Sequence, residues 1–239
     1  MKTILKAALF CAAVLFCGAA RLAAEEKPLV FFVHGWTPGY RPENTSSVPA
    51  PDLFKEKFEG CEISVRAWDS SASFLFFYCV VRNANRFAPV LADEIAAMPP
   101  ERQRNLTLVG HSLGAKIIIR AAALLRGRNV VIRQLVLLGA AIDDDAPEIV
   151  PALEATLLPN VNIYNPEDGT LSFWYRLYNL FWSRALGADG YPGTHPKLRQ
   201  YRVGDDDRVS EKWHSPANYL KRLQKIDLAD PPPDDPPQR

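Results

Sequence analysis

The sequence has almost no net charge. Its 239 residues include 28 Lys+Arg and 27 Asp+Glu, which gives a formal net charge of +1. Proteins that bind nucleic acids use a basic surface to neutralise phosphates, and a balanced chain of this kind gives no support for such a surface. We therefore expect no nucleic-acid partner.

Apolar runs long enough to span a membrane are also lacking. The run at residues 7–20 follows a short basic start and is shorter than the ~20 residues that a spanning helix needs. A basic start, a short apolar run and small residues after it are typical of a signal peptide. We expect residues 1–24 to be a signal peptide, with cleavage near residues 20–24 and export of the remainder to the periplasm or the medium. Loss of Lys2, Lys6 and Arg21 would leave 25 positive against 27 negative residues, a net charge of −2.

Cysteine is scarce. Of the four cysteines, Cys11 and Cys17 fall in the expected signal peptide, so Cys61 and Cys79 remain as an isolated pair. A disulfide between them is one expectation for an exported protein, and two unpaired thiols are the alternative. The chain also has no cluster of metal ligands and no phosphate-binding loop, so we expect no metal and no cofactor.

Composition also excludes collagen-like, coiled-coil and disordered chains, because apolar residues of every size are spread along the sequence. The exception is the proline-rich end at residues 229–239, which we expect to be a disordered, polyproline-like tail. Residues 25–228 remain, a body of roughly 205 residues that suits one well-buried domain.

Short apolar runs alternate with helical patterns along this body. We expect strands at residues 28–33, 61–68, 106–110, 130–138, 161–164 and 198–203, and helices at residues 74–97, 115–126, 146–158 and 215–226. Repeated strand–helix alternation predicts an α/β domain with a mostly parallel sheet covered by helices.

The most informative motif is Gly110-His111-Ser112-Leu113-Gly114, which lies between an expected strand and an expected helix. A serine in such a sharp turn is held in a strained backbone, and the flanking glycines allow the close approach that the turn needs. The following helix directs its first N–H groups toward the same point and so favours a developing negative charge. The motif therefore predicts a nucleophile at Ser112.

The sequence resembles the α/β-hydrolase superfamily, and its lipase- and esterase-like members in particular. The resemblance rests on His34-Gly35-Trp36 after the first strand, the elbow around Ser112, Asp168 after a late strand and His214 before the last helix. It implies a three-layer α/β-hydrolase fold and a serine hydrolase that cleaves carboxylic esters through an acyl-enzyme.

The resemblance also implies a base and an acid. His214 follows the last strand and is the expected base, whereas His195 precedes that strand. Asp168 is the expected acid; Asp143 and Glu167 remain alternatives.

In the family pattern the backbone N–H groups of Trp36 and Leu113 form the oxyanion hole. The residues around them support the elbow and its neighbouring loop: His34, Gly35, Gly110, His111 and Gly114.

An aromatic stretch at residues 173–182 separates the expected acid from the expected base. Trp174, Tyr178 and Trp182 recur at a spacing of four, which predicts one face of a helix. Such a stripe is often buried core; alternatively it lines an acyl pocket or contacts a lipid interface. The expected partners are then a small-molecule or lipid acyl ester and, peripherally, a membrane, with the oligomeric state left open.

Two other functions are compatible with the same residues. One is an acyltransferase or thioesterase that uses the same triad, and the other is a catalytically silent protein that binds lipid or a protein partner. Retention of Ser112, His214 and an acid favours an enzyme, because a binding protein does not need all three.

Overall fold

The computed structural model describes residues 27–37, 52–71, 77–180, 182–210 and 214–229. The expected signal peptide and all but the first residue of the expected proline-rich tail lie outside these ranges.

A six-stranded, fully parallel sheet forms the centre of the domain, in the order β2-β1-β3-β4-β5-β6. The strands are β1 (Leu29–Val33), β2 (Glu62–Arg66), β3 (Leu106–His111), β4 (Gln134–Leu138), β5 (Asn160–Tyr164) and β6 (Leu198–Arg202). Each coincides with an expected strand, so the predicted α/β class and parallel sheet are confirmed.

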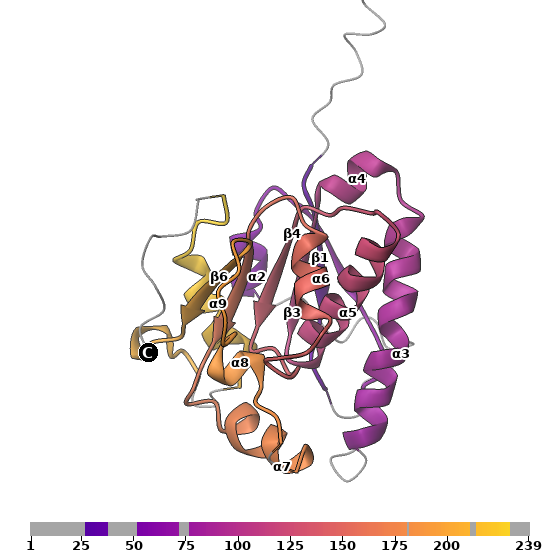
Figure 1. The fold of residues 1–239 in the computed structure, drawn as a ribbon. Helices are drawn as coiled ribbons and strands as arrows, with labels where there is room; N and C mark the ends of the chain where they lie inside the picture. The colour runs from indigo at the N-terminus through magenta and orange to yellow at the C-terminus, as the bar shows by residue number, and fades with distance from the viewer. Residues whose placement is uncertain (1–26, 38–51, 72–76, 181, 211–213, 230–239) are drawn as a thin grey trace, which may run out of the picture.

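Helices cover both faces of the sheet, because successive side chains of a strand point to opposite sides. In β1, Phe31 packs into the core beneath α3 (Phe77–Ala96), α5 (Leu113–Gly127) and α6 (Ile149–Glu154). Its neighbour Phe32 packs into the second core, with α2 (Asp52–Lys57) and α9 (Pro216–Gln224). Figure 1 shows these layers, with α3 and α5 on one side of the strands and α2 and α9 on the other. The domain therefore has the three-layer α/β-hydrolase fold.

Proline accounts for one difference from the predicted helices, a short additional helix after α3. Helix α3 ends before Pro99, and Pro100 then begins the short helix α4 (Pro100–Arg104), since proline is tolerated in a first turn. The helix expected at residues 146–158 is shorter and is limited to α6. Helix α9 begins after Ser215, whose hydroxyl accepts a hydrogen bond from the Ala217 amide, and Pro216 occupies its first turn.

The aromatic helix expected at residues 173–182 is wrong in its second half. A π-helix, η3 (Thr170–Tyr175), leads into a single turn of α-helix, α7 (Arg176–Tyr178). The helix ends there, and Leu180 has a φ of 52°, a left-handed conformation that a continuous helix does not contain. The spacing of four therefore joins Trp174 to Tyr178 but does not extend to Trp182.

Of the two alternatives left open for the cysteines, the structure has the unpaired one, because Cys61 and Cys79 are both free thiols. Cys61 directly precedes β2, whereas Cys79 lies in the first turn of α3, which follows the opposite end of that strand. Five strand residues span about 17 Å, and a disulfide requires Cα atoms within about 7 Å. The two thiols are therefore too far apart to pair.

All six strands point the same way, so their carboxyl ends meet at one edge of the sheet, which is the usual place for a site in open α/β folds. In Figure 1 this edge lies near α7, and α4 lies at the opposite end. No helix in the described part of the chain is long and apolar enough to cross a membrane.

Close packing of α5 against the first strand gives a prediction for Gly114→Ala. A Cβ at residue 114 would lie inside van der Waals contact of the Val33 carbonyl oxygen, and that backbone cannot move without distorting the sheet. We expect a loss of about 2 kcal/mol or more in the free energy of unfolding, measured by urea denaturation.

Gly127→Ala, at the other end of α5, is the matched control. A methyl group there meets no heavy atom within 4 Å. It should leave stability unchanged or raise it by up to about 1 kcal/mol. Equal stabilities for the two variants would contradict the packing argument.

Candidate active site

The backbone of Ser112 forms the turn between β3 and α5. Ser112 has φ 56° and ψ −122°, a conformation that L-residues adopt only when the surrounding structure imposes it. Its amide donates to the Leu138 carbonyl at 3.0 Å, and its own carbonyl accepts from the Ala141 amide at 3.1 Å. Strand β4 and the segment that follows it thus fix the strained residue through its amide and its carbonyl.

Two further glycines make room for this turn. A Cβ on Gly35 would lie 2.9 Å from Cβ of Ser112, and a Cβ on Gly110 would lie 2.6 Å from Cα of Ala115. The loop after β1 can therefore pass directly beside Ser112, with the backbone of residues 34–36 at the serine.

Three side chains from three different loops form a chain of hydrogen bonds. Nε2 of His214 lies 2.8 Å from Oγ of Ser112, and Nδ1 of His214 lies 2.6 Å from Oδ2 of Asp168. Ser112 follows β3, Asp168 follows β5 and His214 follows β6, so the parallel sheet delivers all three to one edge. Asp168 is fully buried and His214 is one-fifth exposed. An imidazole held in this way can accept the serine proton while the carboxylate holds the other ring nitrogen.

Tyr219 is a further member of this hydrogen-bond network, and the sequence analysis did not identify it. Its hydroxyl donates to Oδ2 of Asp168 at 2.5 Å, while the amides of Thr170 and Leu171 donate to Oδ1. Burial alone would raise the pKa of the Asp168 carboxyl, but the hydrogen bonds from His214, Tyr219 and Leu171 outweigh it and hold that pKa below its ordinary value. Tyr219 lies on the buried face of the last helix, five residues after His214, and this position is the signal that could have identified it.

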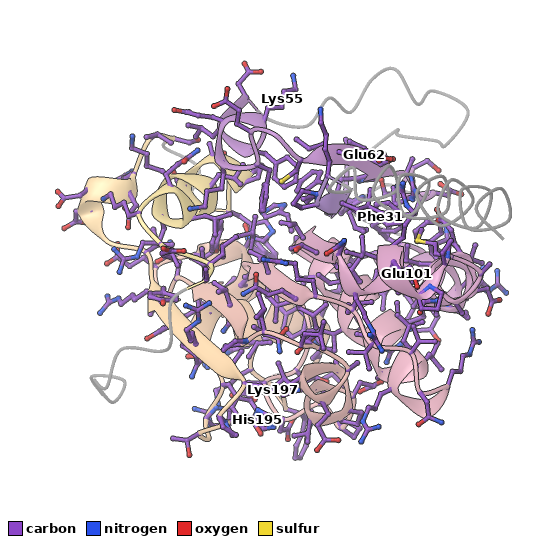
Figure 2. The ribbon with its side chains drawn as sticks, turned by 90° about the horizontal axis from the view of Figure 1, so that it is seen from above. Phe31, Lys55, Glu62, Glu101, His195 and Lys197 are labelled. Carbon is purple, nitrogen blue, oxygen red and sulfur yellow. The ribbon has the colours of Figure 1, made fainter. Side chains whose placement is uncertain are left out.

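The alternative acids have other partners. Asp143 accepts a hydrogen bond from the Tyr175 hydroxyl at 2.7 Å, and Glu167 lies 3.7 Å from Arg202 at the surface. His195, the other candidate base, precedes β6 and therefore lies at the opposite edge of the sheet from Ser112. Figure 2, which views the α4 end, labels His195 beside Lys197 near the rim of the molecule.

His34 is fixed by Trp68. The Trp68 amide donates to Nε2 of His34 at 3.4 Å, and the indole Nε1 donates to the His34 carbonyl at 2.8 Å. Burial lowers the pKa of His34. The neutral ring therefore braces the loop that carries Gly35 and Trp36 beside Ser112.

His111 packs on the ring of His214, with 4.9 Å between the ring centroids. Burial, together with the nearby His214, lowers the pKa of His111 to about 3. A neutral, buried ring at this position supports His214 from below without competing for its proton.

A cavity of about 950 Å³ opens above Ser112 and His214. Trp36 and Leu113 line it, and the Leu113 amide begins α5, so it has no acceptor within that helix. The rest of the wall is mostly aromatic and includes Phe32, Phe77, Phe173, Trp174, Tyr175 and Tyr178. No Asp, Glu, Lys or Arg is among the described residues that line the cavity. The site therefore suits an uncharged, apolar group next to the serine.

The expected pocket residues divide into two groups. Trp174 and Tyr178 line the cavity, and Phe77 links Tyr178 to Trp36 through ring contacts of 4.5 and 5.7 Å. Trp182 does not line the cavity, and its side chain is 89% exposed. Its assignment to the pocket is a correction that follows from the end of the helix at Tyr178. Within the described ranges no group of three or more His, Cys, Asp or Glu side chains is arranged to hold a metal ion.

Sequence comparison places the chain in a family. Residues 76–205, more than half of its length, match the family described as "Protein of unknown function (DUF726)". The chain belongs to this family. The matched region of the DUF726 family includes Ser112 and Asp168 and ends before His214. No curated protein matches the sequence.

Several solved structures are similar to this family member at low sequence identity. A thioesterase from the prodiginine biosynthetic pathway in Streptomyces coelicolor has 13% identity and a TM-score of 0.47, over 83% of this chain and 84% of that one. A type II thioesterase from the yersiniabactin pathway has 14% identity and a TM-score of 0.42, over 84% and 90%. An esterase from Pyrobaculum calidifontis has 16% identity and a TM-score of 0.42, over 84% and 76%.

The bond from Tyr219 to Asp168 gives a prediction for the pH dependence of stability. Because the folded pKa of Asp168 is lowered, its contribution is present above the unfolded pKa of about 3.9 and is lost as pH falls through the folded value. Tyr219→Phe removes one donor and raises that folded pKa. We expect the variant to lose about 1–3 kcal/mol of unfolding free energy near pH 7 and less below pH 4, by urea denaturation at both pH values.

Tyr201→Phe is the control, since Tyr201 packs against the same core as Tyr219 and is not among the partners of Asp168. It should show a small difference that does not change with pH. A loss in Tyr219→Phe that is equally large at low pH would contradict the role assigned to the bond.

Proposed function

We propose that this protein is a serine hydrolase that cleaves carboxylic esters through an acyl-enzyme. The observation that carries the proposal is the continuous set of hydrogen bonds from Ser112 through His214 to Asp168, at the bottom of an open cavity. A purely structural histidine would not need a serine hydroxyl, a buried carboxylate and access to a cavity at once.

The steps follow from the positions of the groups. Nε2 of His214 takes the Ser112 proton as Oγ attacks the ester carbonyl, and the Asp168 carboxylate stabilises the imidazolium that forms. The amides of Leu113 and Trp36 are the proposed donors to the tetrahedral oxyanion. His214 then gives its proton to the leaving alcohol, and water, deprotonated by the same ring, releases the acid and restores Ser112.

The cavity wall supports an uncharged, lipid-like or aromatic ester as the substrate class. An ester that carries a charged group near the carbonyl would lose hydration and find no counter-ion among the lining residues. The volume of about 950 Å³ is at the large end for a small-molecule site, which suits a medium or long acyl chain.

The triad makes the first functional prediction. Ser112→Ala should abolish both labelling by a fluorophosphonate probe and hydrolysis of p-nitrophenyl esters. Asp168→Asn should fold and should lower kcat by about 10⁴-fold, because the amide stabilises the wrong tautomer of His214.

Matched variants distinguish the assigned residues from their rivals. His195→Asn and Glu167→Gln should retain activity with an unchanged thermal unfolding midpoint. His214→Asn should lose activity and, because it also removes a donor to the buried Asp168 carboxylate, should unfold at a somewhat lower temperature. A protein that resists the probe while a control hydrolase reacts would overturn the enzyme assignment. Product analysis with thioesters and with alcohol acceptors separates hydrolysis from acyl transfer.

The aromatic wall makes a second prediction. Trp174→Ala and Tyr178→Ala remove cavity surface that only a longer acyl chain reaches, so kcat/KM should fall about tenfold or more for octanoate relative to acetate esters. Trp182→Ala is the control outside the cavity and should leave this ratio unchanged. Equal losses on both esters would indicate a structural effect and would count against an acyl-binding wall.

A further inference from the structure

Exposed aromatic side chains gather at one end of the molecule. The described residues have five exposed aromatics, Tyr78, Phe173, Trp174, Tyr178 and Trp182, and all of them come from the start of α3 or from residues 173–182. Leu177 and Leu180 in the same segment are also exposed. We call these seven residues the aromatic rim.

The rim is continuous with the cavity. Phe173, Trp174 and Tyr178 line the cavity and are still 38–51% exposed, so they form its mouth. Phe77 contacts Tyr178 and directly precedes Tyr78, which is 79% exposed, so the rim crosses from α7 to α3. Figure 1 shows α7 and the start of α3 at the same end of the domain, opposite α4.

Positive charge that no ion pair balances within the described ranges lies beside the rim, on α3. Residues 169–184 contain Arg176 and Arg184 and no acidic residue. On α3, Arg82 and Arg86 follow Tyr78 at intervals of four on one exposed stripe. Arg176 is paired with Asp189 and Arg184 with Asp144, whereas neither Arg82 nor Arg86 takes part in an ion pair within the described ranges. Asp69, the acid near this stripe, accepts hydrogen bonds from Ser71 and Asn83.

We propose that the aromatic rim docks the protein on the surface of an anionic lipid bilayer, with the mouth of the cavity against the lipid. Tryptophan and tyrosine side chains suit the boundary between headgroups and acyl chains, and arginines one and two turns behind them reach the anionic headgroups. An exposed apolar surface rimmed with cations has this partner chemistry, and a soluble small ester needs none of it. Binding does not require hydrolysis, so Ser112→Ala should dock as the wild type does.

Co-sedimentation with vesicles tests the proposal, with phosphatidylcholine alone and with added phosphatidylglycerol. We expect binding to the anionic vesicles that weakens as salt is added. The triple variant Tyr78→Ala, Leu180→Ala, Trp182→Ala changes rim residues that do not line the cavity. Its affinity for the anionic vesicles should fall about tenfold or more. It should still hydrolyse a soluble acetate ester at the wild-type rate.

The charge stripe has its own variant. Arg82→Glu with Arg86→Glu should weaken binding to anionic vesicles about tenfold or more and change binding to phosphatidylcholine little. Leu157→Ala and Arg104→Glu, exposed positions away from the rim, are the matched controls and should bind normally. Absence of vesicle binding, or equal binding by the rim variants and the controls, would overturn the proposal and would instead assign the rim to a protein partner.

Discussion

The left-handed backbone of Ser112 is the constraint on which the site depends. A strained residue of this kind costs about 1–3 kcal/mol and persists only where its neighbours hold it. Here the Leu138 carbonyl, at the end of the adjacent strand β4, and the Ala141 amide, in the segment after it, hold the residue at the centre of the sheet. Gly114 and Gly35 then follow by necessity, because a side chain at either position would meet Val33 or Ser112 itself. The same turn places the Ser112 hydroxyl above the sheet and the first amide of α5 beside it.

The buried carboxylate of Asp168 sets a second condition. An ionised group with no exposed surface is destabilising unless nearly all of its lone pairs accept hydrogen bonds. Oδ1 accepts from two backbone amides, and Oδ2 accepts from His214 and Tyr219. The Asp168 carboxylate therefore connects the loop after β5, the loop after β6 and helix α9 through hydrogen bonds. A shift in any of them would leave a buried charge partly unsatisfied, which explains why the His214 ring has a fixed orientation toward Ser112.

Local patterns predicted most of the fold, and the limits of the prediction are physical. Short apolar runs located all six strands because a parallel strand is buried on both faces, and the elbow motif located Ser112 because close packing demands its glycines. Asp168 and His214 were expected from the family resemblance and from their places after the late strands. In the structure the His214 ring lies within hydrogen-bonding distance of both Asp168 and Ser112. The catalytic role of these residues stays a prediction. Tyr219 was missed because its contact crosses 51 residues. Periodicity placed Trp182 in the pocket, because a repeat of four residues does not reveal that the helix ends at Tyr178. The sequence also does not show how far apart Cys61 and Cys79 lie in space, so it could not decide whether they pair.

The division of polar and apolar groups bears on how the proposed hydrolase, a nearly neutral protein, would select its substrate. With a net charge close to zero, long-range attraction contributes little to the encounter, and the cavity lining adds no charge of its own. Selectivity must then come from apolar area and from shape, which act only at contact. Aromatic rings suit this task because they bury a large area at a small cost in conformational entropy. Placing such rings both inside the cavity and around its mouth extends one apolar surface from Ser112 to the exterior, so an apolar ester would meet no polar barrier on its way to the serine.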